Sequence, residues 1–174
     1  MYTEKHLQDL QLFYETLSAT TGPLEQKHAA CLQCKKGCFS CCEDDLEIFG
    51  IEAENIRKNF TDFLATAHAH PEGKCAFLDA EGACRIYAAR PYVCRTQGLP
   101  LMIHLEEDGR ELELIDICEL NEPTLSLDEL ADEDFFFTNP WEEKLAILQM
   151  QADKGKMDRM KLRDLFEPSR RHGI

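Results

Sequence analysis

The sequence predicts an α+β fold in which helices at both termini surround a small, irregular, cysteine-rich core that contains a β-hairpin. Three observations support this fold class. Apolar residues recur at helical spacing toward both ends of the chain, an Asp-Gly pair separates two short apolar runs, and nine cysteines crowd into the middle of the 174 residues. Helical spacing and a turn dipeptide between apolar runs are the main local signals for helices and hairpins.

Two helices are expected before the first cysteines. The first runs from Thr3 to about Thr20, because Thr3 can cap it and apolar residues follow at intervals of three or four. Gly22-Pro23 is expected to end it, and a second short helix is expected from Leu24 to Leu32. The apolar positions of the first helix are Leu7, Leu10, Phe13 or Tyr14, and Leu17.

A further helix is expected between the two groups of cysteines. Leu46, Ile48 and Ile51 suggest a short strand or turn, and Glu52 to His70 then has helical spacing. Pro71-Glu72-Gly73 should stop this helix. Its apolar face is expected to consist of Ile56, Phe60, Phe63 and Leu64.

Strands and turns are expected from Cys75 to Cys118. Leu99–Leu105 and Leu112–Ile117 flank the segment Glu106-Glu107-Asp108-Gly109-Arg110, whose Asp-Gly pair predicts a β-hairpin.

Helix is expected again after Asn139-Pro140, with Asn139 as the N-cap and proline in the first turn. The segment Pro168–Ile174 carries charge and little else. The buried stripe of this last helix is expected to be Trp141, Leu145, Leu148 and either Met150 or Met157.

The charge of the chain bears on its partners. With 33 acidic and 19 basic residues, the formal net charge is −14. Such a chain repels polyphosphate backbones and anionic membrane surfaces, so we expect neither nucleic acid nor membrane as a partner. A basic protein or a small molecule would suit the charge better. No apolar run is long enough to span a bilayer.

The cysteines are expected to be reduced. Met1-Tyr2-Thr3-Glu4-Lys5 leads into an amphipathic pattern without the apolar segment of a signal peptide, which predicts a cytoplasmic protein. Thiols stay reduced in that compartment, so clustered cysteines favour metal ligands or redox groups over disulfides. The odd number of cysteines agrees with this interpretation.

The strongest chemical signal is a run of five cysteines within twelve residues, from Cys31 to Cys42. Spacings of two or three residues let thiolates turn toward one ion, at about 2.3 Å from a zinc. Gly37, just before Cys38, supplies backbone freedom for such a turn. Thiolates favour zinc, iron–sulfur clusters or cuprous copper over magnesium or calcium.

A second group supplies further ligands. Because adjacent side chains diverge, Cys41 and Cys42 favour two metal centres or one polynuclear centre. Cys118, which stands alone, could instead be a small buried apolar residue. Without Cys31 the two groups give eight thiols, enough for two four-thiolate sites: Cys34, Cys38, Cys41, Cys42, Cys75, Cys84, Cys94 and Cys118.

Arginines and histidines near the cysteines have their own alternatives. Arg85, Arg90 and Arg95 could donate to thiolate sulfur and offset its charge. Alternatively, Arg90 caps a turn or pairs with a surface carboxylate. His68 and His70 lie two apart and point to different helix faces, so they are expected to be solvated rather than ligands.

Two segments carry a resemblance to a known family. KKGCFSCC at Lys35–Cys42 and KCAFLDAEGACRIYAARPYVCRTQGLPL at Lys74–Leu101 resemble the zinc- or iron-chelating CxxCxxCC family of YkgJ-type cysteine-cluster proteins. CELN at Cys118–Asn121 is similar to a later segment of some members. The resemblance covers about residues 34–121 and implies metal chelation by the eight cysteines named above, with Cys31 as an extra.

These observations predict one domain over residues 1–174, with a cysteine-rich metal-binding core at 31–121 and helical flanks at 1–30 and 122–174. The leading hypothesis is a metal-binding protein that holds zinc or iron, as single ions or as an iron–sulfur centre, through its clustered cysteine thiolates. One alternative is an iron–sulfur redox enzyme or electron-transfer protein. Another is a zinc-stabilised adaptor for a basic protein partner. Whether the chain is an enzyme stays open.

Overall fold

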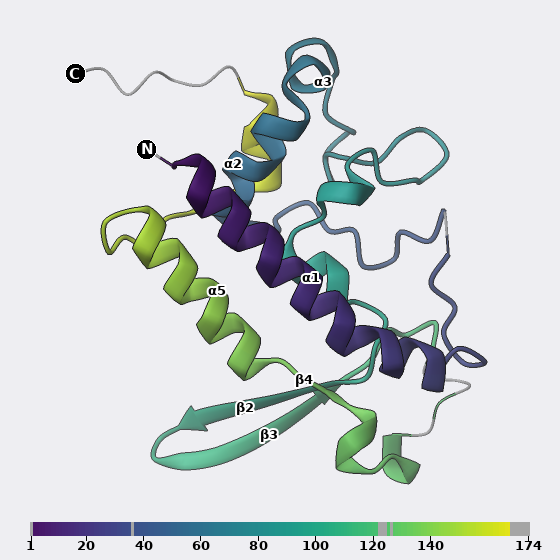
Figure 1. The fold of residues 1–174 in the computed structure, drawn as a ribbon. Coiled ribbons are helices and arrows are strands. Elements are labelled where there is room, and N and C mark those ends of the chain that lie inside the picture. Colours follow the sequence, from purple (N-terminus) through teal and green to yellow (C-terminus); the bar gives the residue numbers. More distant parts are fainter. Residues whose placement is uncertain (1, 36, 122–124, 126, 168–174) are drawn as a thin grey trace.

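The computed structural model describes residues 2–35, 37–121, 125 and 127–167, and it has the predicted α+β architecture (Figure 1). Helices lie at both ends, and the cysteine-bearing loops lie between them. The helices are α1 (Glu4–Lys27), α2 (Gly50–Asn59), α3 (Thr61–Thr66), α4 (Tyr92–Thr96) and α5 (Asn139–Ala152), with short 3-10 turns η1 (Tyr87–Ala89), η3 (Leu127–Glu129), η4 (Asp132–Asp134) and η5 (Leu162–Phe166). The strands are β1 (Glu47–Phe49), β2 (Leu101–Glu107), β3 (Arg110–Asp116), β4 (Phe136–Phe137) and β5 (Arg159–Lys161).

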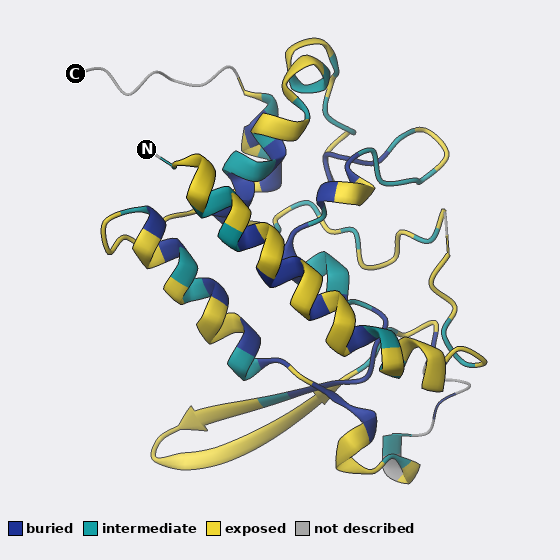
Figure 2. Cartoon of the chain, viewed as in Figure 1, coloured by how far each residue is buried: buried dark blue, intermediate teal, exposed yellow. Residues whose placement is uncertain are grey.

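Helices α1 and α5 lie side by side and form one of two apolar clusters (Figure 1). The ring of Phe13 on α1 meets the edge of Trp141 on α5 with centroids 5.7 Å apart. Figure 2 shows the same helices buried on their facing sides and exposed on the others. We call this the helical cluster; its buried residues include Leu10, Phe13, Tyr14, Leu17, Tyr92, Leu101, Phe136, Trp141 and Leu145.

The prediction that Gly22-Pro23 ends the first helix was wrong, since α1 continues through Pro23 to Lys27. Proline removes one N–H from the helical ladder and crowds the carbonyl four residues earlier, so it disfavours a helix without forbidding one. The turn beyond Pro23 is held by His28, which is buried and whose Nε2 lies 3.0 Å from the carbonyl oxygen of Asp134. The separate helix expected from Leu24 to Leu32 is therefore the end of α1 followed by turns.

The helix expected from Glu52 to His70 is divided at Phe60 into α2 and α3 and ends at Thr66. Thr61 assists the break, because its hydroxyl donates to the carbonyl of Arg57 at 2.7 Å. The break turns Phe63 toward Phe77 and Phe166, with ring centroids 6.3 and 6.0 Å away. These rings belong to a second apolar cluster, the cysteine-side cluster, which includes Ile48, Ile56, Phe77, Leu78, Ile86, Leu162 and Leu165.

The predicted hairpin is confirmed as β2 and β3, joined by Asp108-Gly109. Both turn residues have positive φ, 53° and 72°, as the tight hairpin turn requires. Strand β4 pairs with β2 in parallel, so the sheet order is β3-β2-β4. Asn139 was expected to cap α5, but Thr138 holds that position. The Asn139 side chain instead pairs with the backbone of His104 and fixes the hairpin to the start of α5.

The buried face of α5 differs from the predicted stripe at its C-terminal end. Trp141 and Leu145 are buried as expected, but Met150 is 39% exposed and Met157 is 45% exposed. Gln149 takes the buried position because its side chain accepts the N–H of Ile51 at 2.9 Å, at the start of α2. A polar residue with a backbone partner thus replaces the expected methionine.

Strands β1 and β5 form a separate two-stranded sheet that joins the segment after the first cysteines to the C-terminal part of the chain. The expected short strand near Ile48 is confirmed as β1. Among the described residues, no helix combines the length and apolar character needed to cross a membrane.

Candidate metal centre

Seven of the eight predicted thiols line a single cavity of about 590 Å³. They come from the first cysteine loop, from the turns after residue 74, and from α4. The eight predicted ligands are reduced thiols, and Cys31 is not among the residues that line the cavity. The lining thiols are those of Cys34, Cys38, Cys41, Cys42, Cys75, Cys84 and Cys94.

Tight turns shape the first cysteine loop. The N–H of Cys38 donates to the carbonyl of Lys35 at 2.9 Å, and that of Cys42 donates to the carbonyl of Phe39 at 3.0 Å. Gly37 adopts a φ of 87°, as its place before Cys38 predicted. These turns bring thiols three or four residues apart toward the same cavity.

Backbone contacts join this loop to the second group of cysteines. The N–H of Cys75 donates to the carbonyl of Cys42 at 3.0 Å. A β-bridge pairs Leu78 with Cys84 and returns the chain toward Cys75. Cys42, Cys75 and Cys84 consequently lie against the same apolar residues, in the cysteine-side cluster. Cys94 reaches the cavity from α4.

A different set of contacts gathers Cys34 and Cys118. The Sγ of Cys34 lies so close to Gly98 that a Cβ on Gly98 would overlap it, and Gly98 has a φ of 97°. Asn121, which is fully buried, accepts the N–H of Gln33 and donates to the carbonyl of Gly98, both at 2.7 Å. Cys118, the eighth predicted thiol, has its sulfur 3.9 Å from the Ser40 hydroxyl.

The main electrostatic neighbours of Cys34 and Cys94 follow the same division, although Cys41 acts on both. Burial, then the neighbouring Cys118, Cys38 and Cys41, raises the pKa of Cys34. Burial, then Cys75 and Cys84, raises the pKa of Cys94 well above its usual range. We call the two sets the outer group (Cys34, Cys38, Cys41 and Cys118) and the inner group (Cys42, Cys75, Cys84 and Cys94).

Cys41 and Cys42 connect the two groups through a hydrogen bond between their side chains. This bond lowers the pKa of the more exposed Cys41 and raises that of Cys42. Because the two thiols share one proton favourably, one of them is readily ionised, and the thiolate is the form that binds metal.

The three arginines expected near the thiols have different roles. Arg85 donates to the carbonyls of His68 and Ala76, and Arg95 donates to those of Arg90 and Ala88, so both hold loops in place. Arg90 alone lines the cavity, stacked 3.7 Å over the ring of Tyr87. Its buried Nε has no hydrogen-bond partner among the described residues. Its charge acts on Cys41 and Cys84, one thiol of each group.

One supporting pair was missed at the level of sequence. Asp44 accepts the N–H of Gly73 at 2.8 Å and pairs with Arg163. Arg163 also donates to the carbonyls of His70 and Lys74, at 2.8 and 3.0 Å. The hydrogen bond from Gly73, then the Arg163 guanidinium, lowers the pKa of the Asp44 carboxyl. No local pattern near Arg163 indicates this pairing, because its partners Asp44 and Lys74 lie 119 and 89 residues earlier in the chain.

The donor chemistry of the cavity fits a thiophilic metal. Seven thiols line the cavity, beside the carboxylate residues Glu43 and Asp116, and thiolate sulfur suits zinc and iron centres. None of the described histidines lines the cavity. As the described side chains stand, no three or more His, Cys, Asp or Glu residues form a group arranged to hold a metal ion.

This fold and donor set define a cysteine-cluster protein of the metal-chelating class. The family model "CxxCxxCC: Putative zinc- or iron-chelating domain" matches residues 33–119, half of the chain. The chain therefore belongs to this family, as the resemblance predicted. The matched range contains the outer and inner groups and begins after Cys31. No curated protein and no solved structure matches the chain.

Proposed function

We propose that the chain binds zinc or iron through the eight thiolates of the outer and inner groups, with residues 31–121 as the metal-binding core of a single domain. The observation that carries this proposal is the convergence of seven of these thiols, from segments far apart in sequence, on one cavity. Cysteines bind metal only as reduced thiolates, which accords with the eight reduced thiols of the two groups and with a cytoplasmic location.

We further propose two centres, each with four thiolates. The backbone bond between Cys42 and Cys75 and the bridge at Cys84 support the inner group, while Gly98 and Asn121 support the outer group. The adjacent Cys41 and Cys42 each serve a different centre, which avoids the poor geometry of neighbouring ligands on one ion. A four-thiolate site with a divalent ion carries a charge of about −2, and Arg90 offsets part of it from between the groups.

An iron–sulfur centre is the second candidate, favoured by the size of the cavity. A volume of about 590 Å³ exceeds the space that single ions need, and the lining includes Tyr87 and Gln97 beyond the thiols. The same cysteines could then ligate a polynuclear cluster and support electron transfer.

The test is native mass spectrometry of full-length protein purified without chelators or oxygen, with elemental and sulfide analysis. We expect two equivalents of zinc or iron per chain, lost on denaturation. Inorganic sulfide with a visible absorption band would favour the iron–sulfur candidate. An identical mass under native and denaturing conditions would contradict metal binding altogether.

Serine variants test the ligand assignment. Cys38→Ser should lose the outer metal and Cys94→Ser the inner one, because each removes one of four thiolates. Cys31→Ser is the matched control, since Cys31 lies in the same loop but does not line the cavity. Equal metal loss in all three variants would refute the proposed ligand set.

A further inference from the structure

The sheet β3-β2-β4 has an open edge at β3. All seven residues of β3 are exposed, and Figure 2 shows the hairpin exposed along almost its whole length. An exposed edge strand presents unpaired backbone groups that can pair with another strand. Asp116, at the end of this edge, also lines the thiol cavity, whereas the other residues of β3 do not.

The hydrogen bonds between Asn139 and the His104 backbone show which backbone groups of β3 face the open edge. His104 lies opposite Glu113 in the hairpin, yet its N–H donates to Asn139 at 2.8 Å and its carbonyl accepts from Asn139 at 2.7 Å. The pair of His104 and Glu113 is therefore not hydrogen-bonded between the strands. Because bonding alternates along an antiparallel pair, the backbone groups of Glu111, Glu113 and Ile115 point away from β2.

The side chains of the hairpin give the edge a distinct chemical pattern. One face carries Leu105 opposite Leu112 and Ile103 opposite Leu114, and the three leucines are 38–48% exposed. Arg110 is the sole arginine or lysine between residues 101 and 116. Within the described part of the chain it forms no ion pair, and it stands at the opposite end of β3 from Asp116.

We propose that β3 is the interface of a homodimer, in which two copies pair their β3 strands antiparallel about a two-fold axis at Glu113. Arg110 then lies opposite Asp116 of the second copy, and Leu112 lies opposite Leu114. The outward backbone groups of Glu111, Glu113 and Ile115 are all hydrogen-bonded, and the two three-stranded sheets become continuous. The interface is isologous, as is usual in dimers.

Charge selects this register over its neighbours. In an antiparallel pair, directly opposed side chains lie on the same face of the sheet. A two-fold axis perpendicular to the sheet must therefore place one residue opposite its own copy. An axis at Leu112 would oppose Glu111 to Glu113 twice, and an axis at Leu114 would oppose Leu112 to Asp116 twice. With the axis at Glu113, like charges meet once, beside the His104 ring whose Nε2 lies 3.2 Å from the Glu113 carboxylate.

A basic strand of another protein would also complement the acidic hairpin, but it would leave Arg110 facing like charge. The second copy places Arg110 against Asp116 at both ends of the interface. Opposite charges directly across an antiparallel pair are stabilising, and like charges are destabilising.

Sedimentation of the full-length reduced protein, over a range of micromolar concentrations, tests the proposal. We expect the 20.0 kDa chain to form a dimer. Glu113→Pro should make it monomeric, because proline removes an N–H that points to the open edge while the pairing of β2 with β3 is kept. Unchanged circular dichroism and metal content would show that this variant is folded. A monomeric wild type, or a dimer of Glu113→Pro, would overturn the proposal.

Charge reversal tests the register without proline. Arg110→Asp or Asp116→Arg should each weaken dimerisation at least about tenfold, since two pairs per dimer become repulsive. The double variant Arg110→Asp, Asp116→Arg restores both pairs with the signs exchanged and should recover most of the wild-type affinity. Failure of the double variant to recover would overturn the register, and binding of a basic peptide by a monomeric wild type would assign the edge to another partner.

Discussion

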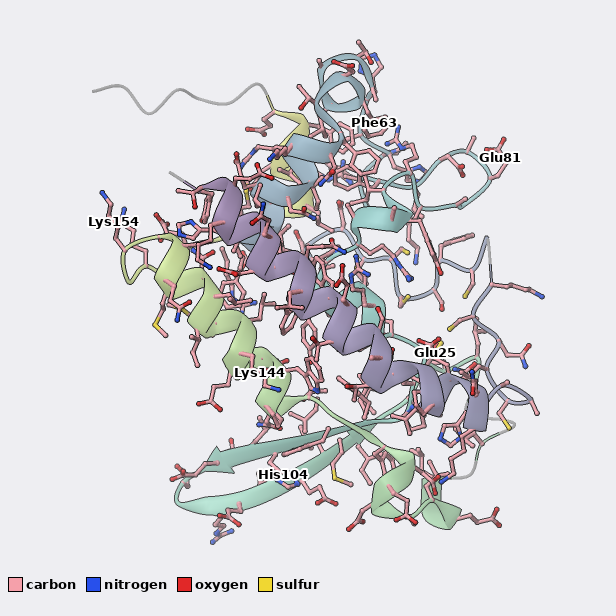
Figure 3. All side chains as sticks on the ribbon, viewed as in Figure 1. Glu25, Phe63, Glu81, His104, Lys144 and Lys154 are labelled. Carbon is pink, nitrogen blue, oxygen red and sulfur yellow. The ribbon has the colours of Figure 1, made fainter. Side chains whose placement is uncertain are left out.

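The helical cluster and the cysteine-bearing region are built on different principles. In the helical cluster, long elements carry apolar side chains at regular spacing, and the rings of Phe13, Tyr14, Tyr92 and Trp141 pack against one another. In the cysteine-bearing region, the described residues of 28–46 belong to no helix or strand, and those of 67–86 form an isolated bridge and turns. In Figure 3, Phe63 of α3 and His104 of the hairpin lie toward opposite ends of the molecule.

This difference in construction indicates that the two regions are stabilised by different interactions. The burial of apolar side chains offsets the conformational entropy lost on ordering α1 and α5, so these helices need no ligand. The cysteine-bearing loops also bury Cys75, Phe77 and Ile86, but none of the described residues from 29 to 46, the first cysteine loop, is buried. Bound metal would supply the missing stabilisation there, and three experiments can sharpen or break this contrast.

Removal of metal should have the largest effect. Structural zinc contributes roughly 10–16 kcal/mol of apparent binding energy in small peptides, as much as the net stability of a typical domain, about 5–15 kcal/mol. We expect chelation under reducing conditions to open protease sites in the cysteine loops at 31–46 and 70–98, while most helical circular dichroism persists.

Two outcomes would contradict this expectation. Complete loss of helical signal would show that metal organises the helical cluster as well. An unchanged digestion pattern would show that the loops are held without metal. The hairpin serves as an internal control, because β4 and Asn139 fix it independently of the thiols.

Truncation of the helical cluster should have the next largest effect. Leu10 on α1 is fully buried, so Leu10→Ala should lower the free energy of unfolding by about 2–5 kcal/mol. Leu12→Ala, on the same helix at 62% exposure, should change it by less than about 0.5 kcal/mol. Denaturant unfolding followed by circular dichroism measures both. Metal content below the transition should match wild type, and a loss of metal in Leu10→Ala would show that the two regions are not separable.

The same contrast determines what the sequence could predict. The hairpin, the terminal helices and the gathering of the cysteines follow from local signals, namely the Asp-Gly turn, the apolar spacing and the ligand-like spacing. The end of α1 did not, because His28 and its distant partner Asp134 override the local effect of Pro23.

Buried polar residues were missed for a related reason. Gln149 is buried because it meets Ile51, 98 residues earlier in the chain, and Arg163 reaches the loop beside Cys75 in the same way. No local pattern marks such residues, because their partners come together only in the folded chain. The division of the thiols into two groups depends likewise on Gly98 and Asn121, which brace Cys34 from distant positions.

Glu52 connects the two regions and gives the smallest and most specific effect. Its buried carboxylate accepts the Tyr14 hydroxyl of α1 at 2.9 Å and the N–H of Tyr92, at the start of α4, at 2.7 Å. Burial raises the pKa of Glu52 even though these hydrogen bonds oppose the rise. The folded protein therefore holds a proton on Glu52 at pH values where the unfolded chain has lost it.

The sign of the pH dependence follows from linkage. Ionised Glu52 costs stability at neutral pH, and this cost is relieved as pH falls through the raised folded-state pKa toward the unfolded value. Glu52→Gln is neutral throughout and lacks this dependence. We expect the free energy of unfolding of wild type to rise relative to that of Glu52→Gln as pH is lowered from 7 to 5.

Because both proteins carry the same thiols, acid-induced loss of metal cancels in the comparison. Glu54→Gln, on the partly exposed face of α2, is the matched control and should follow wild type. Parallel curves for wild type and Glu52→Gln would show that the carboxyl does not couple the helical cluster to the helix that carries Cys94.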